Sequence, residues 1–242
     1  MLNIIRREYL HFQKIRNKYP IVNNSIPILW FGDIERYYSS KKRIVTVSLN
    51  PSSNEFKLPA ETKFSYKYRF PDFKPGDSKS LYIAYNNYYE KPSCYKRWFD
   101  AGYGMVLKGF SASYYDGENI AVHTDIGSQY ATNPNWSKLS DDARINLENI
   151  GLETWHKLMK ILEPDVILFS ASRGYQEKIE RIFKPIEPKW VEKDVKSDTP
   201  LLIRRFNVND KIVCVFFQVQ GRKPFLRTSK EEKLKFANYL IN

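Results

Sequence analysis

Residues 43–56, RIVTVSLNPSSNEF, constrain the fold more than any other stretch of this sequence. The first half is apolar and β-branched, and it stops at Asn50-Pro51. A short apolar run that ends in turn residues is typical of a buried strand in a parallel sheet. In an open α/β sheet, ligands bind just beyond the carboxyl ends of such strands. The sequence therefore places Asn50 where an active-site residue would lie, although a plain polar turn explains the same residues.

Three more apolar runs end in polar or small residues, as the first one does. They cover residues 120–125, 165–172 and 211–218. Residues 201–206 precede the last run across a turn-like tetrapeptide, which predicts a β-hairpin. Because helical patterns separate the strands, we expect parallel strands whose carboxyl ends share one edge. The predicted fold is α/β, a three-layer α/β/α sandwich with a central, mainly parallel four-stranded sheet.

The helical patterns between these strands have recognisable ends. Ser140 is a suitable N-cap for a long helix that runs to Leu162, and Gly151 is a point at which this helix could divide. We expect the other helices within residues 1–20, 93–110 and 173–183 and after Ser229.

The length of 242 residues fits a single domain, residues 1–242, with one core. Within it, residues 57–115 alternate aromatic and basic side chains and are too long for an ordinary connection after a strand. We interpret residues 57–115 as a large insertion after the first strand, or a lid over the site.

Charge is the compositional feature that bears most on function. The formal net charge is +12, and an excess of Lys and Arg attracts polyanions. Nucleic acid is therefore the leading partner, and a solvated basic surface is the alternative. No window is long and apolar enough to span a membrane, and charges interrupt the first residues, so we expect no membrane partner and no signal peptide.

Cysteine usage indicates the compartment. Cys94 and Cys214 are far apart in the sequence and have no metal-binding spacing, which argues against a disulfide framework, a zinc site and an iron–sulfur cluster. A cytoplasmic location fits this usage best.

Three segments, taken together, resemble motifs of the uracil-DNA glycosylase superfamily. TVSLNPS resembles the first motif, VHTDIGSQYATNP with LEPDVILFSAS resembles the middle of the family, and FFQVQGRKPFLR stands in the place of the last motif. The resemblance covers most of residues 28–240, although each motif is short. It implies a monomeric DNA glycosylase that extrudes a nucleotide from double-stranded DNA and hydrolyses its N-glycosidic bond without a metal or another cofactor.

The resemblance also implies roles for particular residues. Asn50 suits the orientation of the attacking water and Asp125 the reading of the base, but the sequence equally allows the two roles to be exchanged. Phe64, Tyr66 or Tyr68 would stack on the base, unless they belong to the core. His123 shares a strand face with Asp125 by alternation and is an additional base-binding candidate, or a packed histidine. The DNA-binding candidates are Ser52, Gln220, Arg222, Lys223, Phe225 and Arg227, with Phe225 or Leu226 as the wedge that enters the base stack.

Two departures from the family pattern point away from uracil. Gln220-Gly221-Arg222 stands where the last motif usually begins with His, and Asp125 stands where the uracil enzymes have Asn. An ionised carboxylate only accepts hydrogen bonds, which suits the N4 amine of cytosine. Removing ordinary cytosine would destroy the host genome, whereas the insertion has room for a bulky substituent. In this form the chain resembles phage-defence DNA glycosylases that excise glucosylated hydroxymethylcytosine.

Three alternatives remain at this stage. The first is a uracil-DNA glycosylase of DNA repair. The second is a metal-dependent PD-(D/E)xK nuclease, whose pattern Pro164-Asp165 and Glu187-Pro188-Lys189 fit only with a proline inside a strand. The third is a non-catalytic DNA-binding module.

Overall fold

A computed structural model describes residues 1–58, 63–90, 95–195, 197, 199–219, 224–226 and 228–240. The chain divides into two compact units, and each unit is assembled from three separate stretches. The first unit comprises Met1–Gly32, Leu49–Cys94 and Thr124–Ile161, and the second comprises Asp33–Ser48, Tyr95–His123 and Leu162–Asn242. The segment expected as one insertion, residues 57–115, is thus shared between the two units.

A mainly parallel sheet forms the centre of the second unit. β1 (Ile44–Ser48), β4 (Val166–Ala171) and β8 (Lys211–Val219) are parallel neighbours, and their apolar side chains are buried except near the two ends of β8, where Ile212 is exposed. β7 (Leu201–Val208) returns antiparallel to β8 through Asn209 and Asp210, which both have positive φ, as the expected hairpin requires. The predicted mixed α/β class with a mainly parallel sheet is confirmed.

Among the described residues the sheet has eight strands, whereas the sequence predicted a central sheet of four. The strand order is β2-β3-β1-β4-β8-β7-β5, and β6 pairs with β7 outside this path. Three of the additional strands have only two or three residues, too few for an alternating pattern to be visible in the sequence. The three short strands are β2 (Ala112–Ser113), β5 (Lys184–Pro185) and β6 (Val191–Lys193). The strand predicted at residues 120–125 is β3 (Asn119–Asp125).

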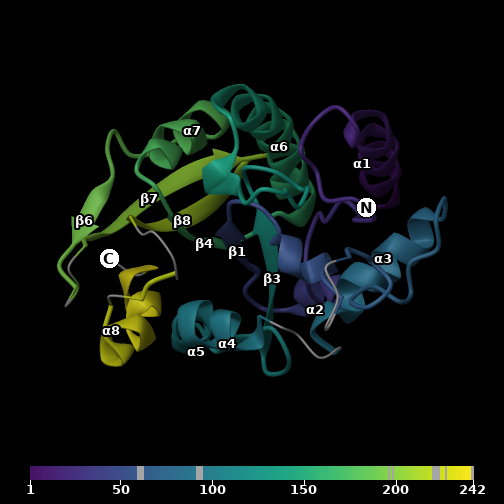
Figure 1. Cartoon of the computed structure of the whole chain (residues 1–242). Helices are drawn as coiled ribbons and strands as arrows, with labels where there is room; N and C mark the ends of the chain where they lie inside the picture. The colour runs from purple at the N-terminus through teal and green to yellow at the C-terminus, as the bar shows by residue number, and fades with distance from the viewer. Residues whose placement is uncertain are drawn as a thin grey trace. The chain divides into compact units, whose positions relative to one another are not determined.

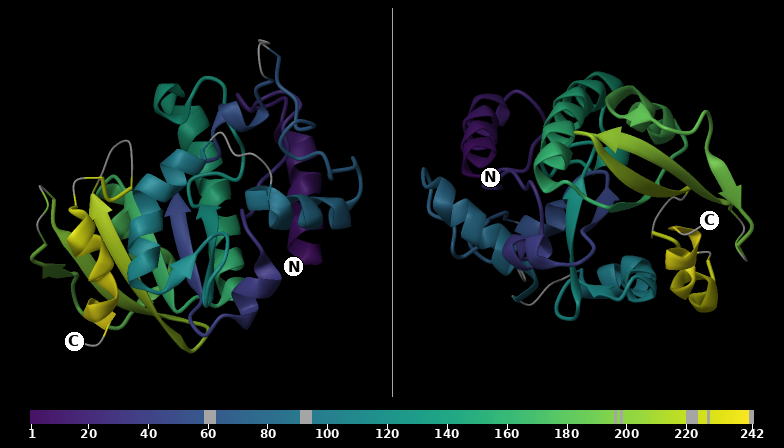
Figure 2. Two further views of the ribbon diagram at one scale, coloured as in Figure 1. Left: turned by 90° about the horizontal axis from the view of Figure 1, so that it is seen from below. Right: turned by 180° about the vertical axis from the view of Figure 1, so that it is seen from behind.

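Helices of the second unit cover both faces of its sheet. Phe217 packs on Phe169 of β4, which in turn contacts Tyr175 of α7, with ring centroids 5.3 and 5.8 Å apart. The neighbouring Phe216 points the other way and packs on Phe236 near the C-terminus. Figure 1 shows α7 on one side of these strands and α5 with α8 on the other, and Figure 2 shows α5 and α8 side by side. The helical elements of this unit are α2 (Ile34–Ser39), α4 (Lys96–Phe99), the π-helical turn Asp100–Gly104, α5 (Met105–Gly109), α7 (Gly174–Ile182), α8 (Lys230–Leu234) and the 3₁₀ turn Phe236–Leu240.

The first unit is mainly helical. α1 (Leu2–Ile15) lies against α3 (Ser78–Asn86) (Figure 1). The long helix α6 (Asp141–Leu162) also belongs to this unit, except for its last residue. The amide of Ala143 donates to the Oγ atom of Ser140, the cap expected for α6. α6 continues through Gly151, so the expected division of this helix is wrong. A core cluster joins α1, α6 and the chain between them: Phe12, Ile15, Ile21, Tyr130, Leu139 and Leu147.

Short turns complete the first unit. They are the 3₁₀ turns η1 (Ser53–Phe56), η2 (Asn87–Glu90) and η4 (Trp136–Lys138). None of the helices in the described part of the chain is long and apolar enough to cross a membrane.

Candidate functional site

The two loops predicted to carry the site are hydrogen-bonded to each other within the first unit. The carbonyl oxygen of Leu49 accepts the amide of Gly127 at 2.8 Å and the amide of Ser128 at 2.9 Å. Leu49 immediately precedes Asn50, and Gly127 follows two residues after Asp125. Main-chain bonds therefore hold the Asn50 loop and the loop that follows Asp125 together, as expected for neighbouring strand ends.

Asp125 is a buried carboxyl group. It is only 3% exposed, and burial, followed by the negative charge of Glu55, raises the pKa of the Asp125 carboxyl well above its usual range. The protonated, neutral form is therefore favoured, and this form can donate a hydrogen bond as well as accept one. The sequence-based argument treated Asp125 as an ionised acceptor, whereas its burial favours the neutral form.

Glu55, which sequence reasoning missed, lies in η1, and its charge is the second cause of the raised pKa of Asp125. The Glu55 Oε1 atom accepts the hydroxyl of Tyr88 at 2.6 Å, and its Oε2 atom accepts Nε of Arg69 at 3.1 Å. The guanidinium carbon of Arg69 also lies 4.9 Å from the centre of the Tyr88 ring. This ion pair is buried, with the Arg69 and Glu55 side chains 2% and 3% exposed. At least one basic side chain of residues 57–115, that of Arg69, thus lies in the core and not on a DNA-binding surface.

The signal that could have revealed Glu55 is ambiguous in the sequence. Ser52 and Glu55 have the spacing of a capping box, in which the glutamate would turn back to the amide of the serine. In the structure Ser52 does cap η1, because its Oγ atom accepts the amide of Asn54, but the Glu55 carboxylate faces Arg69 and Tyr88. The spacing therefore predicts the turn correctly, but it does not reveal that the Glu55 side chain is buried beside Arg69.

Asn50 is partly buried at the start of its loop. Its Nδ2 atom donates to the carbonyl oxygen of Pro51 at 3.0 Å, which orients the side chain locally. Such an amide can hold a water molecule or a base without changing its own charge.

His123 is packed inside the second unit. It is 2% exposed, and its Nδ1 atom lies 2.8 Å from the Oγ1 atom of Thr46. Its ring is surrounded by three aromatic rings with centroids 5.0 to 5.9 Å away: those of Trp98, Phe99 and Tyr103. Burial lowers the pKa of His123 to about 3, so the imidazole is neutral at physiological pH. This environment is that of the packed histidine that the sequence also allowed.

The structure places the remaining candidates in different environments. Phe64 is partly buried, and Tyr66 is half-buried against Phe73 with ring centroids 4.9 Å apart. Phe225 is buried between Tyr103 and Phe236, so as placed it cannot serve as a wedge in DNA. Leu226, the other residue predicted as the wedge, is 53% exposed. Four DNA-binding candidates lie outside the described residues: Gln220, Arg222, Lys223 and Arg227.

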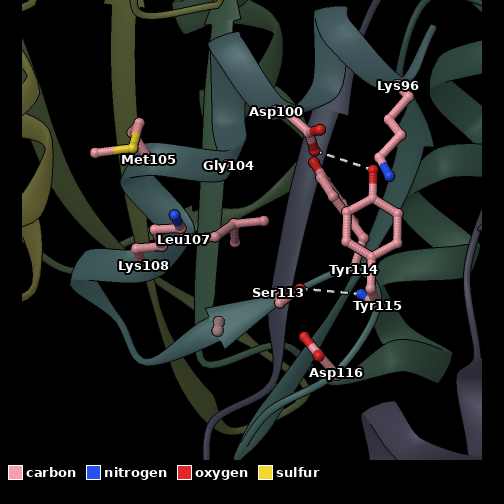
Figure 3. Close-up of a pocket in the computed structure, with 11 residues that line it drawn as sticks. Lys96, Asp100, Gly104, Met105, Leu107, Lys108, Ser113, Tyr114, Tyr115 and Asp116 are labelled. Carbon is pink, nitrogen blue, oxygen red and sulfur yellow. Dashed lines mark hydrogen bonds between the residues drawn. The ribbon is translucent and has the colours of Figure 1, made fainter.

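The second unit contains a pocket of about 390 Å³ beside its π-helical turn (Figure 3). Its walls are the helical run from Lys96 to Lys108 and the segment that ends at Asp116. The hydroxyl of Tyr115 donates to Asp100 at 3.0 Å. Because two lysines and two aspartates line the pocket, their formal charges cancel. None of the described residues predicted for the site lines it.

The residues behind the nuclease alternative lie in the second unit and are paired with cations. Asp165 forms an ion pair with Lys211 at 2.9 Å, and Glu187 forms one with Arg205 at 3.2 Å. Within the described part of the chain, no group of three or more His, Cys, Asp and Glu side chains is arranged to hold a metal ion.

Comparison with known proteins identifies no family. No protein-family model matches this chain, and no curated protein matches it. The argument for function therefore rests on the two joined loops and on the buried carboxyl groups.

Proposed function

We propose that this protein is a monofunctional DNA glycosylase that hydrolyses the N-glycosidic bond of an extruded, cytosine-type base. The observation that carries the proposal is the buried carboxyl of Asp125, whose pKa is raised by burial, at the end of a strand whose following loop is hydrogen-bonded to the Asn50 loop. Perturbed titratable groups of this kind are concentrated at functional sites.

A neutral carboxyl group matches the edge of cytosine. It offers one O–H donor beside one carbonyl acceptor, and cytosine presents the N3 acceptor beside the N4 donor. Asp125 can therefore form two hydrogen bonds with one base. Uracil presents the reverse order, an N3 donor beside the O4 acceptor, and a carboxyl group rotated by half a turn matches that edge too. Uracil is consequently the alternative substrate.

The protonation state of Asp125 also supports a division of roles. A protonated carboxyl group is a poor base for activating water, so we assign the water to the Asn50 amide and the base to Asp125. As the glycosidic bond breaks, the sugar develops positive charge at C1′, and a water molecule held in place there gains most from orientation. Because Asp125 is only 3% exposed, the residues around it have to move before a base can reach it.

The DNA partner is supported by charge. A formal net charge of +12 favours phosphate contacts, and these offset the few kcal/mol that extrusion of a nucleotide costs. Exposed Leu226 is the residue proposed to enter the base stack. In this proposal the chain acts as a monomer in the cytoplasm. Its fold is a three-layer α/β/α domain whose four central strands are β1, β3, β4 and β8. The proposed substrate is glucosylated hydroxymethylcytosine in phage DNA, because a glycosylase specific for this base would not remove the cytosine of the host.

A glycosylase assay tests the proposal. Duplexes with a single uracil, cytosine or glucosylated hydroxymethylcytosine are incubated with the protein in EDTA and then treated with alkali, which cleaves abasic sites. We expect cleavage after alkali at the modified cytosine. In a parallel reaction with Mg²⁺ in place of EDTA, cleavage without alkali would indicate a nuclease, and DNA binding without abasic sites would indicate a binding module.

A further inference from the structure

The pocket beside the π-helical turn of the second unit is built from residues that the proposed glycosylase site does not use. Its volume of about 390 Å³ is in the range of small-molecule sites. We propose that this pocket binds a neutral sugar, a pyranose, through the hydroxyl groups and the apolar C–H face of its ring. The inference does not rest on the glycosylase function, because it concerns other residues and a sugar that is free of DNA.

The buried part of the pocket wall is apolar and aromatic. Leu107, Ala112 and Tyr114 line the pocket and are buried. Covering such a surface removes it from water and is favourable in proportion to the apolar area. A pyranose ring has a face of C–H groups that can cover this wall, whereas a small ion has no apolar surface to offer.

Charged side chains of both signs line the outer part of the same pocket. Lys96, Asp100, Lys108 and Asp116 all contribute to its lining, and all four are exposed. Their formal charges cancel, so a ligand with a net charge of either sign would meet like charges in the pocket. Because like charges brought together are unfavourable, a ligand without net charge is favoured.

The charged groups supply donors and acceptors side by side. An ammonium group only donates hydrogen bonds and an ionised carboxylate only accepts them, whereas a hydroxyl group does both. Tyr115 brings the two kinds together, since its hydroxyl donates to Asp100 at 3.0 Å and Lys96 Nζ lies 5.3 Å from the centre of its ring. Two neighbouring hydroxyl groups of a sugar can therefore bind Asp100 and Lys96 at the same time.

A second donor and a second acceptor distinguish a sugar from a zwitterion. Figure 3 shows Asp116 at the opposite end of the pocket from Asp100, and Lys108 apart from both. A simple amino acid has one ammonium and one carboxylate group and can engage only one lysine and one aspartate. A pyranose carries hydroxyl groups around its ring and can engage all of these side chains. The distribution of polar groups therefore favours the sugar.

Hydrogen bonds hold the pocket wall in place. The Tyr114 hydroxyl lies 2.7 Å from the Oγ1 atom of Thr46 in β1. The amide of Tyr115 donates to the Oγ atom of Ser113 at 3.0 Å, and Arg36 donates to the carbonyl oxygen of Tyr115 at 2.9 Å. A wall that is already ordered lowers the entropic cost of binding.

An NMR titration of the full chain tests the inference. Methyl α-glucopyranoside and methyl α-galactopyranoside are added separately to the ¹⁵N-labelled protein without DNA, and free glycine and inorganic phosphate serve as the zwitterionic and anionic comparisons. We expect at least one pyranoside to shift the amide signals of the pocket residues and to saturate. Because the ligand is neutral, its affinity should change little with added salt, whereas screening would weaken the binding of an ion.

Three variants locate the binding. Lys108→Ala and Asp116→Ala remove exposed side chains that line the pocket, and Lys189→Ala removes an exposed lysine outside it. The first two variants should each weaken sugar binding by about 10-fold, the usual loss of a hydrogen bond to a charged group, and the third should leave it unchanged.

The outcomes that overturn the inference are distinct from a failure of the glycosylase proposal, because no base release is measured. The inference is wrong if neither pyranoside shifts the pocket signals up to its solubility limit. It is also wrong if glycine or phosphate saturates the pocket at lower concentration than the sugars do. Equal sugar affinity in Lys108→Ala, Asp116→Ala and the wild type would place the binding elsewhere and likewise refute it.

Discussion

Gly151 of α6 lies so close to Gly127 that a Cβ atom on Gly151 would be 2.1 Å from the carbonyl oxygen of Gly127. The buried side chain of Gln129 joins the same two segments, because its Nε2 atom donates to the carbonyl oxygens of Asp125 at 3.0 Å and of Gly151 at 3.3 Å. α6 therefore holds the main chain of the loop that follows Asp125. This contact requires glycine at position 151, in the middle of a continuous helix.

Gly151→Ala should displace this loop. The nearest atoms belong to the backbone, which cannot rotate away as a flexible side chain can. We expect the free energy of unfolding to fall by about 1–3 kcal/mol, the usual effect of overpacking. Gly174→Ala in α7 is the control, because its added Cβ atom would meet nothing within 4 Å, and it should be neutral or stabilising by up to about 1 kcal/mol. Urea unfolding measures the change in the free energy of unfolding for both variants. Equal changes would contradict the close contact between Gly151 and Gly127.

Asn50→Ala should abolish base release while DNA binding persists. The side chain is assigned to hold the attacking water, so its loss should lower kcat by roughly 100-fold or more. Asn54→Ala, at an exposed position in η1, should retain activity. Abasic-site formation and fluorescence anisotropy on the same duplex provide the two measurements. Full activity in Asn50→Ala would refute the assignment.

His123 should make the protein sensitive to acid. Burial lowers the pKa of His123 to about 3, below its ordinary value near 6.5. A histidine with a lowered pKa contributes stability that is present above about pH 6.5 and is lost as pH falls toward 3. In His123→Gln the free energy of unfolding should therefore decline less over this pH range than in the wild type. Identical pH slopes in urea unfolding would show that His123 is not buried in the neutral form.

Asp125 should have the opposite pH dependence. Its raised pKa means that the stability it contributes is present below its ordinary pKa, near 4, and is lost as pH rises through the raised value. Asp125→Asn cannot ionise and escapes this loss. The variant should thus become more stable relative to the wild type as pH rises above about 4, as measured by the difference in the free energy of unfolding. A constant difference would indicate that the carboxyl group is not held in its acid form.

The elements that the sequence predicted best are those in which one strong signal specifies the structure. β1, β4 and β8 are continuous apolar runs that end in turn residues, and a parallel strand buried on both faces needs such a run. α6 begins at a serine cap and reaches Leu162 as expected. Gly151 was misread as a possible break, because its contact with Gly127 depends on a segment distant in the sequence.

The candidate site was predictable only in part. The placement of Asn50 and Asp125 at neighbouring strand ends follows from the order of the strands, but the raised pKa of Asp125 depends on its burial and on the charge of Glu55, which only the tertiary fold determines. The sequence alone does not show whether a basic or aromatic residue lies in the core or on a DNA-binding surface. For the same reason Phe225, expected at the DNA, lies in the core of the second unit.

Mass analysis of the bases released from DNA tests the central claim most directly. Duplexes that contain cytosine, uracil or glucosylated hydroxymethylcytosine are incubated in EDTA with the wild type or with Asp125→Asn, and the free bases are identified. We predict that the wild type releases an intact cytosine-type base, and that this release is largely lost in Asp125→Asn. Release of uracil alone, or of no base from any of the three duplexes, would contradict the account.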